Sequence, residues 1–436
     1  MRFDFAVVGG GIAGLATAEL LQRSGRSVVL IEREAQLCGG ATAAAQGWFH
    51  TGALYAALPR GTFFRQLAGN LDDLLNYYAC FPGMNLRSGR HLVTRGQDGW
   101  FANRTNYYGY VAATHPALTR WQRAWWGLAT LHARSRLSWF ETLDFTRELS
   151  PQIGAWTLSA NLRRSLARRR LDLDLGPAPT WLTSRDRTLR AHKLCVDLAD
   201  SFLGHGGRLE LGQPVRRLAK GLVETAGATF RARNLIVAAG AASAGLARTS
   251  MQVVRSPMLV VQPELSDVNF VKMAPDLGST FNHLHHVTAQ GGYSLIGNAV
   301  YLPAGGEADL AALGTRLCHQ AGALFGVDMA RHRTALYLGD KTEVVGLRQA
   351  RNYQYHILDE GDRVVILPGK MSLCFSLAVN VCRHFGIDPT TELGPVRSGQ
   401  AARLVALPEH ERRFQELVAA GPAGQPIELA RRAGRP

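Results

Sequence analysis

Three glycines near the start of the chain have the spacing G-x-G-x-x-G, at Gly9, Gly11 and Gly14. They follow an apolar run and open a stretch with helical apolar spacing, which is the setting in which this motif binds a dinucleotide. The first glycine permits a sharp turn, the second lets pyrophosphate oxygens approach the backbone, and the third lets the helix pack on the strand. The amide groups at Ile12 and Ala13 would then face the anion at the positive end of the helix.

An acidic residue, Glu32, stands eighteen residues after the last of these glycines. The sequence predicts a strand over 4–8, a helix over 12–23 and a second strand over 27–31, which together make a βαβ unit. Glu32 therefore lies at the end of the second strand, where its carboxylate can accept hydrogen bonds from ribose hydroxyls. A turn that binds no nucleotide is the alternative, and the complete motif disfavours it.

The place of the motif in the chain, together with the apolar segment 234–240, favours FAD over NAD. These segments resemble the D-amino-acid oxidase superfamily of flavoproteins, which includes glycine and sarcosine oxidases. The resemblance extends to Glu32-Arg33, Val215 and the turn Ala239-Gly240. It implies non-covalent FAD in contact with Arg33, with the backbone of Val215 at the adenine and Ala239-Gly240 close to the dinucleotide.

A histidine, His50, lies in the segment 39–55, which is similar to the G-x-T/S…I-H-x-G-x-x-Y stretch of L-2-hydroxyglutarate and glycerol-3-phosphate dehydrogenases. The resemblance implies that Thr42 contacts phosphate, that Ala41 and Gly47 also lie at the cofactor, and that His50 lies at the isoalloxazine. A histidine there can act as a general base on a substrate hydroxyl. A structural histidine bonded to a backbone carbonyl is the alternative.

An arginine, Arg348, stands in a stretch that resembles the G-x-R segment of amino-acid oxidases. The resemblance implies that Arg348 binds the substrate carboxylate, which suits the two-pronged guanidinium group. A surface ion pair is the alternative, and Arg351 is a rival for the same role. The sequence departs from the families at Gln349, where proline is frequent, and at Ala44 and Ala45, where Arg-Asn is usual.

The segment 368–373 is similar to the S-P-G-x-x-x-S-L-A stretch of the hydroxyglutarate enzymes and precedes a predicted helix. Amides at the start of that helix would face the flavin and stabilise negative charge on it, and Lys370 would add to this field. Cys374 lies one turn further and is interpreted as a small buried residue. The cofactor contacts implied here are Gly369, Lys370, Met371 and Ser372.

The length of 436 residues predicts two or three domains. The β-type runs between 253 and 300 predict a second sheet, apart from the βαβ unit. We therefore expect an α+β or α/β fold, in which a discontinuous Rossmann-like FAD-binding domain carries an inserted substrate-binding domain with an antiparallel sheet. The predicted boundaries are 1–80, 190–250 and 355–400 for the FAD-binding domain, 81–189 and 251–354 for the substrate-binding domain, and 401–436 for a C-terminal helix and tail.

The composition disfavours several other classes of protein. The six cysteines are scattered without a C-x-x-C pair, so we expect reduced thiols and neither a disulfide framework nor a zinc site. No apolar run approaches the ~20 residues that span a bilayer, and the first residues lack the pattern of a signal peptide, which predicts a cytoplasmic protein. The net charge of +15 is interpreted as an arginine-rich surface, since no nucleic-acid-binding motif accompanies it.

An aromatic cluster, Trp121, Trp125, Leu128 and His132, follows helical spacing. We favour a buried amphipathic helix that covers the active site. The alternative is a peripheral membrane contact through the region Trp121–Trp126.

Three histidines, His283, His285 and His286, lie on a predicted strand with a spacing that metal ligands can have. No carboxylate or cysteine stands beside them in the sequence. We therefore expect them in the wall of the substrate pocket and predict no metal site.

Together these motifs predict an FAD-dependent oxidoreductase that removes hydride from a carbon bearing a hydroxyl group in a small anionic substrate. His50 would act as base, Arg348 would hold the anion and Lys370 would support the flavin. One alternative is an amine or amino-acid oxidase of the glycine and sarcosine oxidase type. Another is a flavin-binding, membrane-docked module without turnover. The motifs do not choose between oxygen, a quinone and a protein as electron acceptor.

Overall fold

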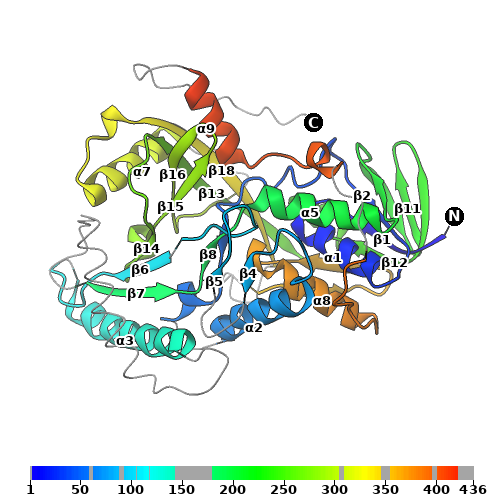
Figure 1. Cartoon of the computed structure of the whole chain (residues 1–436), viewed down its shortest axis with the longest axis horizontal. Coiled ribbons are helices and arrows are strands. Elements are labelled where there is room, and N and C mark those ends of the chain that lie inside the picture. The colour runs from blue at the N-terminus through cyan, green and yellow to red at the C-terminus, as the bar shows by residue number, and fades with distance from the viewer. Residues whose placement is uncertain are drawn as a thin grey trace.

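Two eight-stranded sheets lie at opposite ends of the molecule in this computed structural model (Figure 1). Two short ribbons, β3–β8 and β4–β5, lie apart from these sheets. The residues that the structure describes are 2–57, 62–87, 93–104, 106–116, 118–142, 179–303, 309–344, 354–394 and 400–420.

The first sheet has a parallel centre in the order β20–β12–β1–β2–β9. Antiparallel strands β10 and β11 continue it beside β12, and β19 pairs with β20. The bounds are β1 (Arg2–Val8), β2 (Val28–Ile31), β9 (Arg208–Glu210), β10 (Val215–Ala219), β11 (Leu222–Thr225), β12 (Thr229–Val237), β19 (His356–Asp359) and β20 (Val364–Leu367).

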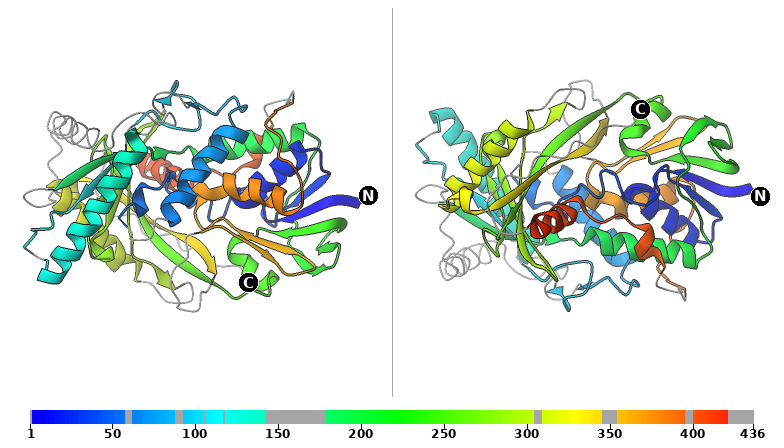
Figure 2. Two further views of the ribbon diagram at one scale, coloured as in Figure 1. Left: turned by 90° about the horizontal axis from the view of Figure 1, so that it is seen from below. Right: turned by 90° about the horizontal axis from the view of Figure 1, so that it is seen from above.

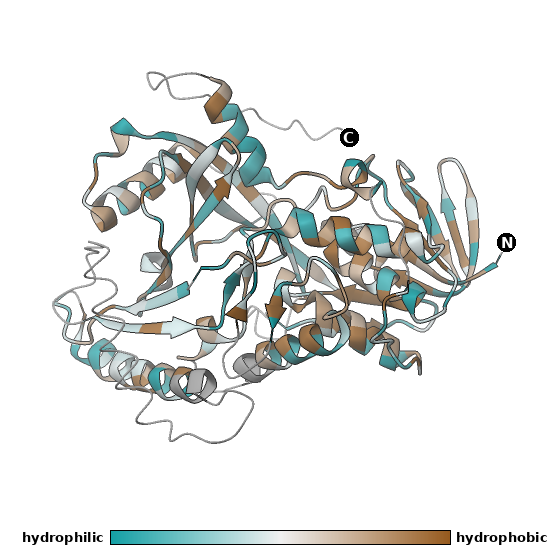
Figure 3. Ribbon diagram, viewed as in Figure 1, coloured by the Kyte–Doolittle hydropathy of each residue, from teal (hydrophilic) through white to brown (hydrophobic). Residues whose placement is uncertain are grey.

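The central strands of this sheet are apolar on both faces because both faces are covered. Phe5 and Val7 pack with α1 (Ile12–Arg23), α5 (Ala191–Gly204) and α8 (Cys374–His384), and α1 contacts both other helices. Ala6 and Val8 lie in a separate cluster with Phe230 on the other face. Figure 3 shows the apolar residues concentrated in this helical layer and in the strands beneath it. The carboxyl ends of β1 and β2 thereby lead into the glycine turn and Glu32.

The second sheet has the order β17–β13–β16–β15–β14–β6–β7, with β18 beside β13. Its neighbouring strands are antiparallel except β14 and β6, which are parallel. The sequence predicted a purely antiparallel sheet; β6 and β14 are far apart in the chain, so no hairpin sets their direction. The bounds are β6 (Asn106–Tyr110), β7 (Thr180–Ser184), β13 (Met251–Gln262), β14 (Asn269–Met273), β15 (Phe281–Thr288), β16 (Gly291–Asn298), β17 (Leu302–Pro303) and β18 (Arg333–Val344).

Helices cover both faces of the second sheet. One face packs on α7 (Leu310–Phe325), and the other packs on α9 (Glu409–Ala419) and one side of α3 (Arg120–Thr142). Figure 2 shows α3 from below together with α2 (Thr62–Tyr77) and α8, and shows α5 and α9 from above. Within the described ranges, no helix combines the length and the hydropathy that crossing a membrane requires.

The orientation of α3 differs from the expected one. Its buried side carries Trp126, Ala129 and Ala133, whereas Trp121 and Trp125 are exposed. Small alanines allow close approach to β7, so this side packs and the more aromatic side faces solvent. The expectation that Trp121, Trp125 and Leu128 lie on the buried side of this helix is therefore wrong.

Several histidines are buried in a neutral state, which makes the fold sensitive to acid. Burial lowers the pKa of His283 to about 3 and that of His286 to about 4. The unfolded chain takes up these protons near pH 6.5, so the free energy of unfolding falls as the pH drops below that value.

We expect His283→Asn to reduce this pH dependence. His283 lies between the carbonyl of Val268 and the hydroxyl of Ser294, at 2.8 and 2.7 Å, so the variant is less stable at pH 7.5. Its further loss of stability between pH 7.5 and 5 should nevertheless be smaller than that of the wild type by about 2 kcal/mol. Urea unfolding at both pH values measures this, with the exposed His319→Asn as control. An equal loss of unfolding free energy between pH 7.5 and 5 in the wild type and His283→Asn would show that His283 is not the buried neutral histidine responsible.

Candidate active site

In the turn between β1 and α1, the backbone packs tightly against the protein at two glycines and has free space at the third, where a phosphate is predicted. Gly9 has φ +108°, and a Cβ there would lie 2.5 Å from the carbonyl oxygen of Ala238. A Cβ at Gly14 would lie 1.9 Å from the carbonyl oxygen of Gly9. At Gly11 the nearest such atom is Thr42 Oγ1, at 3.5 Å. The backbone at Gly11 is therefore the part of the turn that a ligand can approach.

The start of α1 can receive an anion. Its first turn holds no acidic residue, and the cap residue Gly11 offers no side chain. Thr42 accepts a hydrogen bond from the amide of Ile12 at 3.0 Å. The hydroxyl hydrogen of Thr42 remains able to donate to a phosphate oxygen. Thr42 and the amides of this turn thus fit a bound pyrophosphate.

Glu32 lies at the edge of the same turn. One oxygen of its carboxylate accepts from the amide of Gly10 at 2.6 Å. The amide of Gln213 donates to the carbonyl of Glu32 at 2.9 Å, which brings the start of β10 at Val215 beside it. The residue that follows β2 and the segment that precedes β10 therefore meet where the adenosine is predicted.

The other predicted cofactor residues are spread around this turn. Ala239 lies against it, with its Cα 2.8 Å from a Cβ built at Gly9. Gly240 and Gly47 have positive φ, at +53° and +87°. Arg33 and Ala41 are exposed. Their contacts with a cofactor remain predictions.

The turn between β20 and α8 contains an unsatisfied polar group. Gly369, with φ +63°, turns the chain into the short helix Met371–Leu373. Asn70 of α2 donates to the carbonyl of Ser372 at 2.6 Å and accepts from the amide of Ser376 at 3.0 Å. Ser372 Oγ is buried and has no hydrogen-bond partner among the described residues. Such an atom is costly unless a ligand satisfies it, which fits a polar ring bound at this turn.

A buried carboxylate, Asp186, holds His50. The Nδ1 atom of His50 lies 3.1 Å from Asp186 Oδ2, and the hydroxyl of Tyr108 donates to the same oxygen at 2.7 Å. Asp186 Oδ1 accepts from the amide and the hydroxyl of Thr51, at 2.7 and 2.8 Å. A charged carboxylate only accepts, so His50 Nδ1 carries the proton and Nε2 carries the lone pair.

The charges of this pair follow from their surroundings. Burial alone would raise the pKa of Asp186, but the hydrogen bonds from His50, Thr51 and Tyr108 outweigh it and leave the pKa lowered. Burial lowers the pKa of His50 and positive charge on Lys370 lowers it further, against the opposing effect of Asp186. At neutral pH the aspartate is charged and the imidazole is neutral.

Two lysines add positive potential near His50. Lys370 and Lys341 both act on its pKa, and Lys370 Nζ lies 5.4 Å from the centre of the Tyr55 ring. Lys370 thus lies close enough to His50 to act on its pKa, and the roles predicted for both residues stay predictions. Arg348, the predicted anion ligand, and its rival Arg351 lie outside the described residues.

Sequence reasoning missed three residues of this site: Asp186, Tyr108 and Thr51. Asp186 stands between two arginines in the turn after β7, where it resembles a surface charge. The tyrosine-rich strand β6 gave no sign that the Tyr108 hydroxyl donates to Asp186. Thr51 adjoins His50, and only the pairing of β3 (Trp48–Phe49) with β8 (Arg187–Thr188) brings both next to Asp186.

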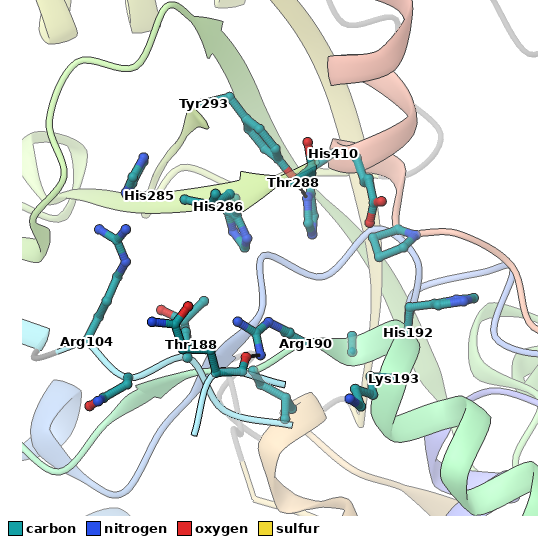
Figure 4. Close-up of a pocket in the computed structure, with 18 of the residues that line it drawn as sticks. Arg104, Thr188, Arg190, His192, Lys193, His285, His286, Thr288, Tyr293 and His410 are labelled. Carbon is teal, nitrogen blue, oxygen red and sulfur yellow. Dashed lines mark hydrogen bonds between the residues drawn. The ribbon is translucent and has the colours of Figure 1, made fainter. Parts of the chain in front are cut away.

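A cleft of about 750 Å³ opens beside this site, between the start of α5, β15 and the start of α9 (Figure 4). Arg104, Arg190, His285, His286 and His410 are among its lining residues. The glycine turn, His50, Asp186 and Lys370 do not line it. We therefore treat the cleft as separate from the candidate active site.

Of the three histidines on β15, His285 and His286 line the cleft. His283 instead is completely buried, with both ring nitrogens hydrogen-bonded. Its expected place in a pocket wall is therefore wrong. In the described part of the chain, no three side chains of His, Cys, Asp or Glu come together as a metal site would require.

Comparison with protein families decides the class of protein. The family model described as FAD dependent oxidoreductase (DAO) matches residues 4–357. The chain belongs to the DAO family. It is therefore an FAD-dependent oxidoreductase, and FAD is its cofactor. No curated protein sequence matches it closely enough to count as a relative.

Solved structures share the fold of this DAO-family enzyme. An FAD-dependent oxidoreductase of Pseudomonas aeruginosa is 18% identical, with 95% of this chain and 99% of that chain covered and a TM-score of 0.58. Glycine oxidase of Geobacillus kaustophilus is 16% identical, with 93% and 98% covered and a TM-score of 0.60. L-α-glycerophosphate oxidase of Mycoplasma pneumoniae, solved with FAD bound, is 14% identical, with 92% and 99% covered and a TM-score of 0.62.

We expect Gly14→Ala to abolish FAD binding by this DAO-family enzyme. The added Cβ would lie 1.9 Å from the backbone oxygen of Gly9, a contact that only displacement of the turn can relieve. The measurement is the flavin absorbance of the purified protein, and a lower melting temperature should accompany the loss. Gly69→Ala is the matched control, because a Cβ on that helical glycine meets nothing within 4 Å. A Gly14→Ala protein with full flavin content would show that the turn does not hold the dinucleotide.

Proposed function

We propose that this enzyme oxidises a carbon that bears a hydroxyl group, in a small anionic substrate, and that the FAD is held without a covalent bond. The observation that carries the proposal is the network around Asp186, which holds the His50 ring with its proton on Nδ1, while burial keeps the ring neutral and leaves Nε2 as the base. The second sheet, with β6 supplying Tyr108, would form the substrate side of the site.

The proton step follows from the two pKa directions. Bound FAD supplies a ring that accepts the hydride. His50 Nε2 takes the proton of the substrate hydroxyl, and the imidazolium that forms is stabilised by Asp186 at 3.1 Å. Asp186 itself stays charged, because its pKa is lowered. A positioned base of this kind contributes about 10²–10⁴-fold to the rate.

Lys370 and Lys341 support an anionic substrate. Both ammonium groups are close enough to lower the pKa of His50, so the site has positive potential where the substrate would lie. Two cations near a neutral imidazole attract a carboxylate or a phosphate. Arg348, which the resemblance assigns to such an anion, would add to them.

Amine or amino-acid oxidation is the second candidate, and the fold supports it equally. The Mycoplasma neighbour is named for a hydroxy compound with a phosphate, whereas the Geobacillus neighbour is named for an amino acid. The Asp186–His50 pair favours the hydroxyl, because a hydroxyl must lose its proton as hydride leaves. An amine that binds in its neutral form needs no such base.

An anaerobic panel of hydroxy acids, polyol phosphates and amines tests the proposal. We expect a hydroxy compound with an anionic group to bleach the flavin absorbance, and His50→Asn to slow this step by about 10²–10⁴-fold with the flavin retained. Bleaching by an amine at an unchanged rate in His50→Asn would instead identify an amine oxidase.

Replacement of Asp186 tests the positioning of the base. In Asp186→Asn the carboxamide can donate to His50 Nδ1, which places the ring proton on Nε2 and removes the base. We expect flavin reduction to slow by about 10²-fold or more, while the flavin content stays normal. Stopped-flow absorbance measures both rates.

The neighbouring tyrosines provide a matched pair for this test. Tyr108→Phe removes a hydrogen bond to Asp186 and should slow flavin reduction, whereas Tyr110 is equally buried and its hydroxyl has no partner in the described ranges. Tyr110→Phe should therefore keep the wild-type rate. Equal rates in Asp186→Asn and the wild type would remove Asp186 from the mechanism.

A further inference from the structure

The outer side of α3 exposes large apolar side chains that the fold leaves uncovered. Trp121 is 86% exposed, Trp125 50%, Leu128 54% and Leu131 61%. Of the seven large apolar residues that are exposed in the described ranges, these four lie on one helix. A patch of this kind on a folded protein marks an interaction surface.

The helix geometry gathers these side chains into one stripe. Each residue turns the helix by about 100°, so Trp121, Trp125, Leu128 and Leu131 lie within an arc of about 120°. Trp126 points the other way, is 3% exposed, and its Nε1 donates to the carbonyl of Val111 at 2.8 Å. The stripe therefore leaves out Trp126, although it lies within the region Trp121–Trp126, and it continues beyond that region to Leu131.

The helix carries positive charge beside the stripe. The sequence from 111 to 140 contains no aspartate or glutamate, and it contains Arg120, Arg123, Arg134 and Arg136. The whole chain has a net charge of +15. Tryptophan prefers the interface between lipid and water, and arginine can keep its charge at the headgroups while its stem lies on apolar surface.

In the part of the chain that the structure describes, the stripe lies on the outside of the molecule. The helix runs along the outer edge of the molecule, at the end away from the first sheet (Figures 1 and 2). No helix in the described ranges can span a bilayer, so any membrane contact there is peripheral. A second copy of the chain fits less well, because a symmetric contact would bring the arginines of two α3 helices together.

We propose that α3 docks the enzyme on an anionic lipid surface, with Trp121, Trp125, Leu128 and Leu131 inserted at the level of the headgroups. Electrostatic attraction brings the helix to the bilayer, and burial of the apolar stripe holds it there. The docking is independent of the substrate oxidised at His50.

Co-sedimentation of the full-length, FAD-loaded protein with vesicles tests this proposal. We expect binding to vesicles of equal parts phosphatidylcholine and phosphatidylglycerol, little binding to phosphatidylcholine alone, and weaker binding as salt is added. The double variant Trp121→Ala, Leu128→Ala should lower the affinity for the anionic vesicles by about tenfold or more, because it removes two of the four inserted side chains. Its flavin content and melting temperature should match those of the wild type.

Val287→Ala with Leu407→Ala is the matched control, since both residues are exposed and apolar but lie away from α3. Unchanged affinity in the α3 variant would show that net charge alone binds the vesicles and would overturn the proposal. Absence of binding to either kind of vesicle would also overturn it. Sedimentation velocity tests whether a second copy of the chain covers the stripe instead. A wild-type dimer that becomes a monomer in the α3 variant, when neither protein binds vesicles, would identify the stripe as a subunit interface.

Discussion

Asp186 carries a negative charge in a completely buried position, and the candidate active site is built around satisfying it. An isolated buried carboxylate would be very unfavourable, so its four hydrogen bonds are a requirement of the fold as well as of catalysis. The donors come from the segment after β3 and from β6, while Asp186 itself lies between β7 and β8. The ribbon and the second sheet must therefore both be in place before His50 is held as a base.

The two sheets supply different parts of the candidate active site. The first sheet leads into the glycine turn and Glu32, which are predicted to bind the dinucleotide through backbone amides and one carboxylate. The second sheet brings Tyr108 to Asp186 and so fixes the ring of His50. Lys370, on the turn after β20 of the first sheet, also acts on the pKa of His50. The histidine thus lies where the two parts of the molecule meet.

The sequence predicts the strand, turn and helix at the start of the chain well, because they depend on local backbone geometry. Gly9 and Gly11 lie in the three-residue turn between β1 and α1, Gly14 lies in the first turn of α1, and Glu32 directly follows the next strand. The place of His50 at the flavin, which the motif around it predicts, stays a prediction. The helix α1 begins at 12 and ends at 23, as the apolar spacing predicts, because this spacing also reflects local backbone geometry.

The remainder depends on contacts that spacing does not encode. Asp186 is 136 positions from His50, and the sequence gives no pairing of β3 with β8 from which their contact could be foreseen. The helix over 120–142 has apolar residues on two sides, and only packing against β7 decides that Trp126 is buried and Trp121 exposed. The parallel pairing of β6 with β14 in the second sheet also depends on a long-range contact, since β6 joins the sheet from a distant part of the chain.

The most direct test of the central claim is the ¹⁵N chemical shift of the His50 ring nitrogens in the FAD-loaded protein, followed from pH 8 to pH 5. We expect a neutral ring at pH 7, protonated on Nδ1 and unprotonated on Nε2, that gains its second proton only below the ordinary histidine pKa of about 6.5. A ring that is protonated on Nε2, or one that is already charged at pH 7, would show that His50 is not held as a base.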